Sequence, residues 1–411
     1  MDLHVSTLFF DMTSYFASVW QAEEPSLRGH PVGVLTTDAP GAALIAASRE
    51  AKALGVTGMM RAAEARKICP SIQFRVAKHD LFVDYHHRIR DAVDTVIPIH
   101  RAHSVDEFSC LLTGSQQELS RALSIGADLQ NAILEQVSPA LTCSVGVAPN
   151  KMLAKVAAAL RKPGLDWMHP SVLPQKIAHL RLKDLPGVSK GILPRLAAAG
   201  INDVTALHTM SPKAARHLWG NVEGERFVRQ LQGEHVVYPE TKRHSLGHGQ
   251  NLTPQNRTQD AARLVARRLL VKAASRLRRE GVYARSLHVS AKCEGQGRLS
   301  IDGQIAPTQD SFTLLRIFER YWAQLPVTRP IAVSVMLGGL QDTRDDPGDL
   351  FSPTRAGEPT GSEALCASID KLNALFGQDT IRYGELPPQK VAYTGAKIAF
   401  NRVPDRSEFH E

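Results

Sequence analysis

The sequence predicts a multidomain α/β (α+β) protein, and three observations support this fold class. The chain has 411 residues, 43% of them hydrophobic, which is enough for roughly two to four separate cores. Short β-prone apolar runs at 8–10 and 141–147 alternate with stretches of helical period such as 81–96. Near residue 242 the chain turns strongly basic and a new series of helices and strands begins, so we expect a domain boundary there.

Composition narrows the class of protein. The formal net charge of +8 is spread unevenly, which favours a polyanionic partner, with plain solubility as the alternative. Five scattered cysteines without a CxxC pair indicate neither a disulfide framework nor a zinc ribbon and fit a reducing cytoplasm. No apolar run approaches the roughly 18 residues of a membrane helix, and no signal-peptide pattern is present. We expect a soluble cytoplasmic protein without membrane contact.

The first apolar run, at 8–10, has the pattern of a buried strand that ends in Asp11. An unpaired carboxylate buried there would cost several kcal/mol, so a cation is expected beside it. The alternative is that Asp11 caps the helix that begins near Thr13 or Ser14. This stretch alone leaves both interpretations open.

Residues 19–72 have the pattern of a small α/β insert, with strands at 31–36 and near Leu44 and helices at 48–54 and 60–68. Arg49 and Lys52 share one face of the first of these helices. They are either solvated or, if the fold brings them near Asp11, phosphate ligands.

A second pair of acids, Asp106 and Glu107, lies in the β-prone stretch 104–112, after a long helix at 78–96. Adjacent carboxylates raise each other's pKa, so a cation is needed nearby. Adjacent strand residues point to opposite faces, so both acids reach one site only where the strand ends, bulges or twists. A hairpin turn with two solvated acids is the alternative. Together with Asp11 they would suit two Mg²⁺ ions in phosphoryl transfer.

The middle of the chain continues with a helix at 116–134, a strand at 141–147 and a helix that begins at Asn150. Lys162 follows this helix, where the helix dipole alone would explain a cation. The turn at 185–191 resembles a helix-hairpin-helix, in which backbone N–H groups bind a nucleic-acid phosphate. An ordinary helical turn is the alternative. Because other cations surround the turn, we favour DNA contact by Gly187, Ser189, Lys190 and Gly191.

The helix expected at 261–279 carries seven Lys and Arg residues and no acid. A solvated basic face is the default interpretation, but uncompensated cations repel one another and a phosphate backbone would relieve that. We therefore expect contacts with the DNA backbone from Arg263, Arg267, Arg268 and, on the following strand, Arg285.

The segment 341–357 reads as an acidic, Pro/Gly-rich linker. Within it, Asp349, Leu350 and Phe351 form a short apolar segment of the kind that docks on a partner. A helix with one apolar face is expected at 362–376.

These motifs resemble, in order, those of the Y-family translesion DNA polymerases of the DinB and UmuC group, over about residues 5–340. The matching stretches are FFDMTSYFAS, SREAKALGV, SVDEFS, SVGVAPNKMLAKVAA with RKPG, and LPGVSKG. The resemblance implies a right-hand polymerase with palm, fingers, helical thumb and little-finger domain. The palm would span 1–18 and 78–165, the fingers 19–77, the thumb with its helix-hairpin-helix 166–238, and the little finger 242–340, before a linker and C-terminal tail at 341–411.

The resemblance also implies an activity and its cofactor. It implies a low-fidelity DNA polymerase that copies damaged templates, acts on primer–template DNA and dNTPs, and has the sliding clamp and SOS accessory subunits as candidate partners. Two Mg²⁺ ions would be held by Asp11, Asp106, Glu107 and the Met12 carbonyl. A catalytically silent, polymerase-like scaffold is the alternative, and the three carboxylates argue against it because a scaffold need not retain them.

Further roles follow from the same resemblance. Phe16, five residues after Asp11, takes the position of the steric gate against a ribose 2′-OH. Arg49 stands where DinB-like members have Tyr, and Ala46 where they have Thr. Asp349, Leu350 and Phe351 resemble the end of a clamp-binding peptide without its leading Gln. The nucleotide contacts implied are Tyr15, Phe16, Arg49, Lys52 and Lys162.

Overall fold

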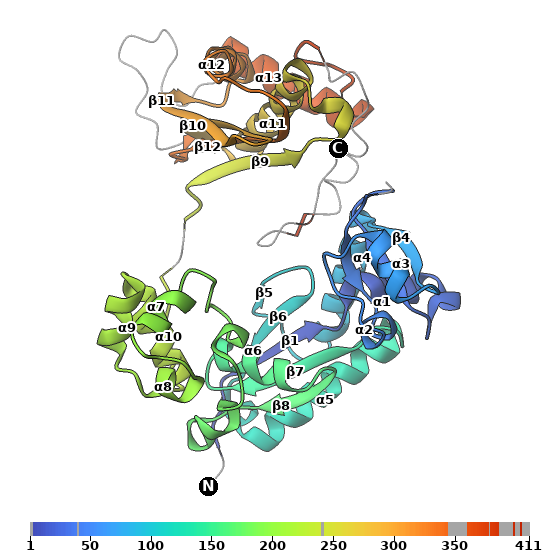
Figure 1. Cartoon of the computed structure of the whole chain (residues 1–411), viewed down its shortest axis with the longest axis vertical. Helices are drawn as coiled ribbons and strands as arrows, with labels where there is room; N and C mark the ends of the chain where they lie inside the picture. Colours follow the sequence, from blue (N-terminus) through green and yellow to red (C-terminus); the bar gives the residue numbers. More distant parts are fainter. Residues whose placement is uncertain are drawn as a thin grey trace. The chain divides into compact units, whose positions relative to one another are not determined.

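The computed structural model describes residues 3–38, 41–239, 242–343, 360–377, 379–385, 398 and 403–404 (Figure 1). The chain forms two compact units, one of Met1–Tyr238 with Ala396–Arg406 and the other of Pro239–Gly395 with Ser407–Glu411. Among the described residues, no helix combines the length and apolar character that crossing a membrane requires.

A five-stranded sheet in the order β5-β6-β1-β7-β8 lies at the centre of the first unit (Figure 1). β1 is antiparallel to both of its neighbours, whereas β7 and β8 run parallel. The strands are β1 (Thr7–Met12), β5 (Arg101–Ala102), β6 (Glu107–Leu111), β7 (Cys143–Ala148) and β8 (Gly164–Trp167).

The central strand β1 is buried on both faces, which explains its unbroken apolar run. Leu8 and Phe10 belong to the core cluster that includes residues of α4 (His79–Asp94) and α5 (Leu119–Gln136). Phe9 belongs to a different cluster with residues of α6 (Lys151–Leu160). Because side chains alternate along a strand, Asp11 lies on the α6 side of the sheet, just before α1 (Tyr15–Glu23).

Two residues position α6 on that face. The Asn150 Oδ1 atom accepts the Leu153 N–H at 2.9 Å and so caps the helix. A Cβ atom at Gly146 of β7 would lie 1.9 Å from the Ala154 carbonyl oxygen, so only glycine allows this close approach of helix and strand. The cations of α6 are thereby held over the face that carries Asp11.

The insert has its own sheet, in the order β3-β2-β4, and its own small core. Ser48 caps α2 by accepting the Ala51 N–H at 3.3 Å. The expected helices and strands are present, but the prediction missed β4, which pairs in parallel with β2. The elements are β2 (Val32–Leu35), β3 (Leu44–Ala47), α2 (Arg49–Ala53), α3 (Ala62–Ile68) and β4 (Gln73–Val76).

The last part of the first unit is helical. Its core includes Leu196, Leu207 and Trp219 and is continuous with the α6 side of the sheet. The helices are α7 (Leu193–Ala198), α8 (Val204–Thr209), α9 (Pro212–Trp219) and α10 (Val222–Leu231).

The second unit is an antiparallel sheet in the order β11-β10-β12-β9, with β13 pairing with β10. α11 and α12 share a core with the alternate residues Leu287, Val289 and Ala291 of β10, so they cover one face of the sheet. The elements are β9 (Ser245–Asn251), α11 (Gln259–Glu280), β10 (Val282–Cys293), β11 (Gly297–Thr308), α12 (Ser311–Trp322), β12 (Pro330–Gly338), β13 (Gln341–Asp342) and α13 (Gly361–Phe376).

Candidate active site

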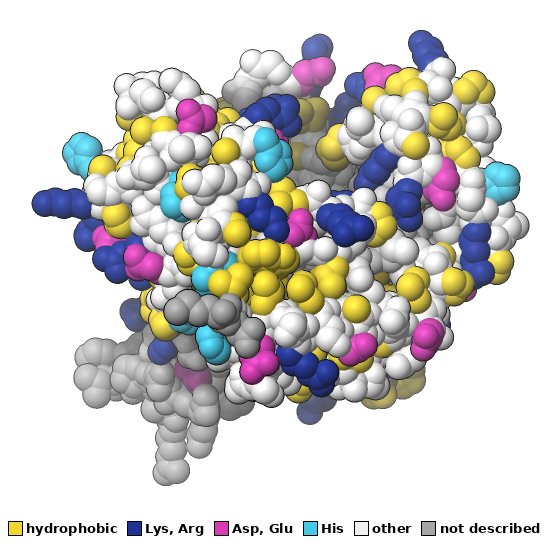
Figure 2. Space-filling view, turned by 90° about the horizontal axis from the view of Figure 1, so that it is seen from below, with side chains coloured by type: hydrophobic (Ala, Val, Ile, Leu, Met, Phe, Trp, Pro, Cys, Tyr) yellow, Lys and Arg dark blue, Asp and Glu magenta, His cyan; other side chains and the backbone are white. Residues whose placement is uncertain are grey.

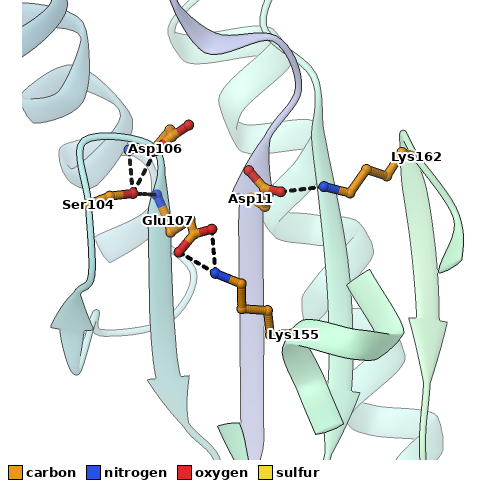
Figure 3. Close-up of polar contacts among 6 residues, drawn as sticks. All are labelled: Asp11, Ser104, Asp106, Glu107, Lys155 and Lys162. Carbon is orange, nitrogen blue, oxygen red and sulfur yellow. Dashed lines mark hydrogen bonds and ion pairs between the residues drawn. The ribbon is translucent and has the colours of Figure 1, made fainter. Parts of the chain in front are cut away.

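The pairing of β1 with β6 brings the acids together. Asp11 lies opposite Glu107 in the ladder, and the Met12 N–H donates to the Asp106 carbonyl at 2.9 Å. All three acids therefore lie at the same end of two neighbouring strands (Figure 3). Since β6 begins only at Glu107, Asp106 lies before the regular strand. Side chains of adjacent strand residues point to opposite faces, so Asp106 and Glu107 can reach one site because the strand starts between them.

Ser104 organises the bend before β6. Its hydroxyl donates to Asp106 Oδ1 at 2.6 Å and accepts the Glu107 N–H at 3.1 Å. Burial raises the pKa of Asp106 to about 6; the Ser104 bond opposes this rise, and the negative charges of Asp11 and Glu107 add to it. The sequence analysis did not single out Ser104, although a hydroxyl two residues before a buried acid is a recognisable signal.

Two lysines supply cations beside the partly buried acids Asp11 and Glu107. Lys162 Nζ lies 2.6 Å from Asp11 Oδ2, and Lys155 Nζ lies 2.6 and 2.7 Å from the two oxygens of Glu107 (Figure 3). Lys162 is therefore more than a cation at a helix end, because it contacts the acid itself. Lys155 was not among the predicted site residues, although it lies only seven residues before Lys162, on the helix that precedes Lys162.

A third lysine reaches the site from the insert. Lys52 Nζ lies 2.8 Å from the hydroxyl of Ser14, in the turn between β1 and α1. Burial lowers the pKa of Lys52, the charge of Lys162 lowers it further, and Asp11 opposes the change. The fold thus brings Lys52, Lys162 and Asp11 together, as the phosphate interpretation of Lys52 requires. Arg49, on the same helix, is exposed and forms no ion pair within the described residues.

The two aromatic residues after Asp11 differ in their surroundings. Tyr15 is only 2% exposed, and its hydroxyl donates to the Phe82 carbonyl at 2.6 Å. The ring of Tyr15 therefore belongs to the core, and the nucleotide contact expected at Tyr15 stays a prediction. Phe16 is partly exposed, and its ring centroid lies 4.5 Å from that of Phe82.

The acids suit a hard divalent cation by chemistry, since all of them offer oxygen ligands. The charge balance also fits, because two lysines now neutralise carboxylates that a metal would otherwise neutralise. Their oxygens do not yet converge, however. Across the part of the chain that the structure describes, no cluster of three or more His, Cys, Asp or Glu residues is close enough to hold a metal, and Figure 3 shows the Asp106 carboxylate turned away from Glu107. The donor atoms therefore suit a divalent cation by their chemistry, while the three side chains do not form a closed set of ligands in this structure.

The predicted DNA contacts of the first unit lie on an exposed turn. Gly187 has a φ of 98°, which glycine tolerates, and Ser189, Lys190 and Gly191 are exposed before α7. The segment before the turn is a 3₁₀ helix, Leu182–Asp184, rather than an α-helix. On the face of the molecule drawn in Figure 2, Lys and Arg are dispersed among Asp and Glu, so the net positive charge is not gathered there.

In the second unit, the premise that the cations of α11 are uncompensated is wrong. Arg263 and Arg267 pair with Glu319 of α12, and Arg268 pairs with Asp379 after α13. Sequence inspection of the helix alone could not reveal these partners. Arg285 is exposed and donates to Gln341 at 3.2 Å. Asp349, Leu350 and Phe351 lie outside the described residues.

Comparison with known proteins identifies the family of the chain. Residues 10–159 match the impB/mucB/samB family, and residues 243–350 match the C-terminal domain of the same family. DNA polymerase IV of Moorella thermoacetica is 29% identical over 410 residues, covering 96% of this chain and 98% of the relative. DNA polymerase IV of Pseudomonas entomophila is 30% identical over 246 residues, covering 58% of this chain and 68% of the relative.

A solved structure shares the fold. It is a Y-family DNA polymerase chimera, Dbh-Dpo4(243-245)-Dbh, with a TM-score of 0.67 and 20% identity, covering 82% of this chain and 99% of that one. The matched family models and the relatives lead to one conclusion: the chain belongs to the impB/mucB/samB family, and it has the fold of a Y-family DNA polymerase.

Proposed function

We propose that this chain is a DNA-directed DNA polymerase that performs low-fidelity translesion synthesis past damaged template bases. The relatives named DNA polymerase IV and the family match support this activity. The observation that carries the assignment to this site is the meeting of Asp11, Asp106 and Glu107 at one end of β1 and β6, with Lys52 and Lys162 beside them.

The three carboxylates, with the Met12 carbonyl, are proposed to hold two Mg²⁺ ions. When bound, these ions would promote loss of the primer 3′-OH proton and offset the negative charge of the triphosphate. Glu107 and Asp11 hold their positions through the β1–β6 ladder, and Ser104 holds the bend that presents Asp106. Lys155 and Lys162 would release the carboxylates as metal replaces them.

The incoming dNTP is proposed to lie between the insert and the sheet. Lys52 and Lys162 would bind its triphosphate, with exposed Arg49 as a further ligand. Phe16, packed on Phe82, would press against the sugar and exclude a 2′-OH. Because the positive charge of Lys162 lowers the pKa of Lys52, an anion bound between the two lysines would relieve this repulsion.

The primer–template duplex is the proposed macromolecular partner, held by the turn at Gly187–Gly191 and by the second unit through Arg285. Arg263, Arg267 and Arg268 remain weaker candidates because they are paired. Because its substrate is DNA, the protein is proposed to act in the bacterial cytoplasm. The candidate partners there are the sliding clamp, contacted through Asp349–Phe351, and SOS accessory subunits. A silent scaffold is the alternative function, and the retained acids disfavour it.

Primer extension by the purified full chain tests the proposal. We expect Mg²⁺-dependent addition of dNTPs opposite an abasic site as well as on an undamaged template, with no product in EDTA. A chain that binds primer–template DNA but adds no nucleotide, with or without clamp and accessory subunits, would support the scaffold alternative instead.

A further inference from the structure

The end of the chain returns to the first unit. Residues 239–395 belong to the second unit, but the C-terminal segment, Ala396–Arg406, belongs to the first. Within this segment the structure describes Ile398, Val403 and Pro404. Ile398 and Val403 pack against the core cluster that includes residues of α4 and α5, and Pro404 is buried. The C-terminal segment therefore contributes apolar side chains to a core whose other members lie at least 230 residues earlier in the chain.

One hydrogen bond locates this contact at the start of α4. The Ile398 N–H donates to Nδ1 of His79, the first residue of the helix, at 3.4 Å. The N-cap residue of α4 is Lys78, which forms no side-chain cap hydrogen bond. An ammonium group has no acceptor for the helix N–H groups, and the end of a helix without a cap depends on packing to stay formed. The C-terminal segment packs at this end.

The first turn of α4 leads directly to the proposed steric gate. Phe82 lies one turn after His79 and is fully buried, and the two rings meet edge to face with centroids 6.4 Å apart. The carbonyl of Phe82 accepts the Tyr15 hydroxyl at 2.6 Å, and its ring centroid lies 4.5 Å from that of Phe16. A continuous series of contacts thus runs from Ile398 through His79 and Phe82 to Phe16.

Few contacts are needed to keep the C-terminal segment in place, because it is tethered to the rest of the chain. A covalent tether holds a segment near its binding surface at an effective concentration on the order of millimolar. The effect reaches Phe16 because packed side chains transmit displacements rather than absorb them. Since the partly exposed ring of Phe16 rests on Phe82, the position of Phe82 sets the position of that ring.

We propose that Ile398, Val403 and Pro404 are positioning residues for nucleotide selection. By docking on the first turn of α4 they hold Phe82 in place, and Phe82 fixes the ring of Phe16 that meets the sugar of the incoming nucleotide. This inference rests on the proposed polymerase function and on the role of Phe16 in it. It extends that function, because it makes the C-terminal segment part of the discrimination between ribose and deoxyribose.

Hydrogen exchange of the full chain tests the docking step without catalysis. In the double variant Ile398→Ser/Val403→Ser, amides of the first turn of α4 should exchange about tenfold faster. One of them is the Phe82 N–H, which donates to the Lys78 carbonyl at 3.1 Å. The control Val237→Ser changes an exposed apolar side chain of the same unit and should leave this exchange unchanged. Unchanged exchange in the double variant would overturn the docking step.

Single-nucleotide insertion kinetics test the link to Phe16. In the double variant the efficiency of ribonucleotide insertion relative to deoxyribonucleotide insertion should rise about threefold. The KM for dNTP should stay unchanged, because Lys52 and Lys162 remain in place. In a Phe16→Ala background the two serine substitutions should change the ratio no further, since the ring that they position is gone. An unchanged ratio, or an equal rise with and without the Phe16 ring, would overturn the positioning role.

The two measurements separate this proposal from the proposed function. If the wild-type chain inserted no nucleotide, the polymerase function would fail, and the exchange rates would still decide whether the C-terminal segment docks on α4. If the wild-type chain inserted deoxyribonucleotides but the double variant kept its sugar discrimination, only the positioning role would be wrong.

Discussion

At the residue scale, the environment of each side chain decides its role. Asp11 is held by Lys162 and sits in the β1 ladder opposite Glu107. Tyr15, four residues after Asp11, is buried in the core, whereas the next residue, Phe16, is partly exposed. The carboxylates could be singled out from the sequence because charge in an apolar context demands a partner, whereas Lys52 was expected only from its helix face and from the family resemblance. The partners Lys155 and Ser104 could not be singled out, since their contacts depend on how α6 and the bend before β6 are placed.

Replacement of Phe16 tests the steric gate. Phe16→Ala removes the ring packed on Phe82 and opens space for a ribose 2′-OH, so ribonucleotide insertion relative to deoxyribonucleotide insertion should rise about tenfold or more. Single-nucleotide insertion kinetics measure the ratio, and Phe16→Tyr is the matched control that retains the ring. An unchanged ratio in Phe16→Ala would refute the role of Phe16.

His86 makes stability depend on pH. It is 2% exposed, its Nδ1 lies 2.8 Å from the Val105 carbonyl next to Asp106, and burial lowers its pKa to about 4. The unfolded chain, with a pKa near 6.5, therefore binds more protons between pH 6.5 and 4, and stability should fall by about 2–3 kcal/mol as pH drops through that window.

The measurement for His86 is urea unfolding at several pH values. His103 has a pKa lowered in the same direction, so His86→Gln should remove about half of the acid sensitivity of the first unit. Acid sensitivity equal to that of the wild type would show that His86 is not buried in its neutral form.

At the element scale, the sequence pattern of α11 predicted its helical structure but not the ion pairs of its arginines. Its length and helical period were predicted nearly to the residue, as Gln259–Glu280 against the expected 261–279. Its charge was misread, because Glu319, Asp370 and Asp379, which neutralise Arg residues of α11, lie far along the chain. The helix α13 was predicted, but the face that packs against α11 could not be predicted. Its apolar pattern also includes Leu365, Leu372 and Phe376, which the structure leaves exposed.

The ion pair between Arg278 and Asp370 is expected to hold α13 on α11. The Arg278 side chain is 6% exposed and donates to both Asp370 oxygens, at 2.6 and 3.0 Å. Asp370→Asn leaves a buried guanidinium without its counter-charge and should destabilise the second unit by about 3 kcal/mol. Hydrogen exchange of α13 should accelerate. Arg243→Gln, which removes an exposed partner of Glu280, is the control and should cost under about 1 kcal/mol; equal costs for the two variants would contradict this role.

At the scale of the whole molecule, the chain consists of two compact units, and the catalytic acids lie in the first. The first unit brings acids of β1 and β6 together with lysines from α6, from the segment after α6 and from the insert. The residues of this site thus come from segments up to 151 residues apart. The sequence predicted that the three acids lie together, because each acid lies in or at the end of a β-prone apolar stretch. The sequence did not predict β8 or β4, short strands whose pairing depends on tertiary contacts rather than on local pattern.

Single-turnover insertion of one dNTP by Asp106→Asn on prebound primer–template DNA measures whether the acids of β1 and β6 perform nucleotidyl transfer. Asn keeps the shape of Asp106 but removes its charge, so we predict a loss of about 10³-fold in the insertion rate, roughly 4 kcal/mol, with DNA affinity within about twofold of the wild type. The control Asp128→Asn, at an exposed acid on α5, should insert at the wild-type rate. Insertion by Asp106→Asn at the wild-type rate would show that Asp106 takes no part in nucleotidyl transfer.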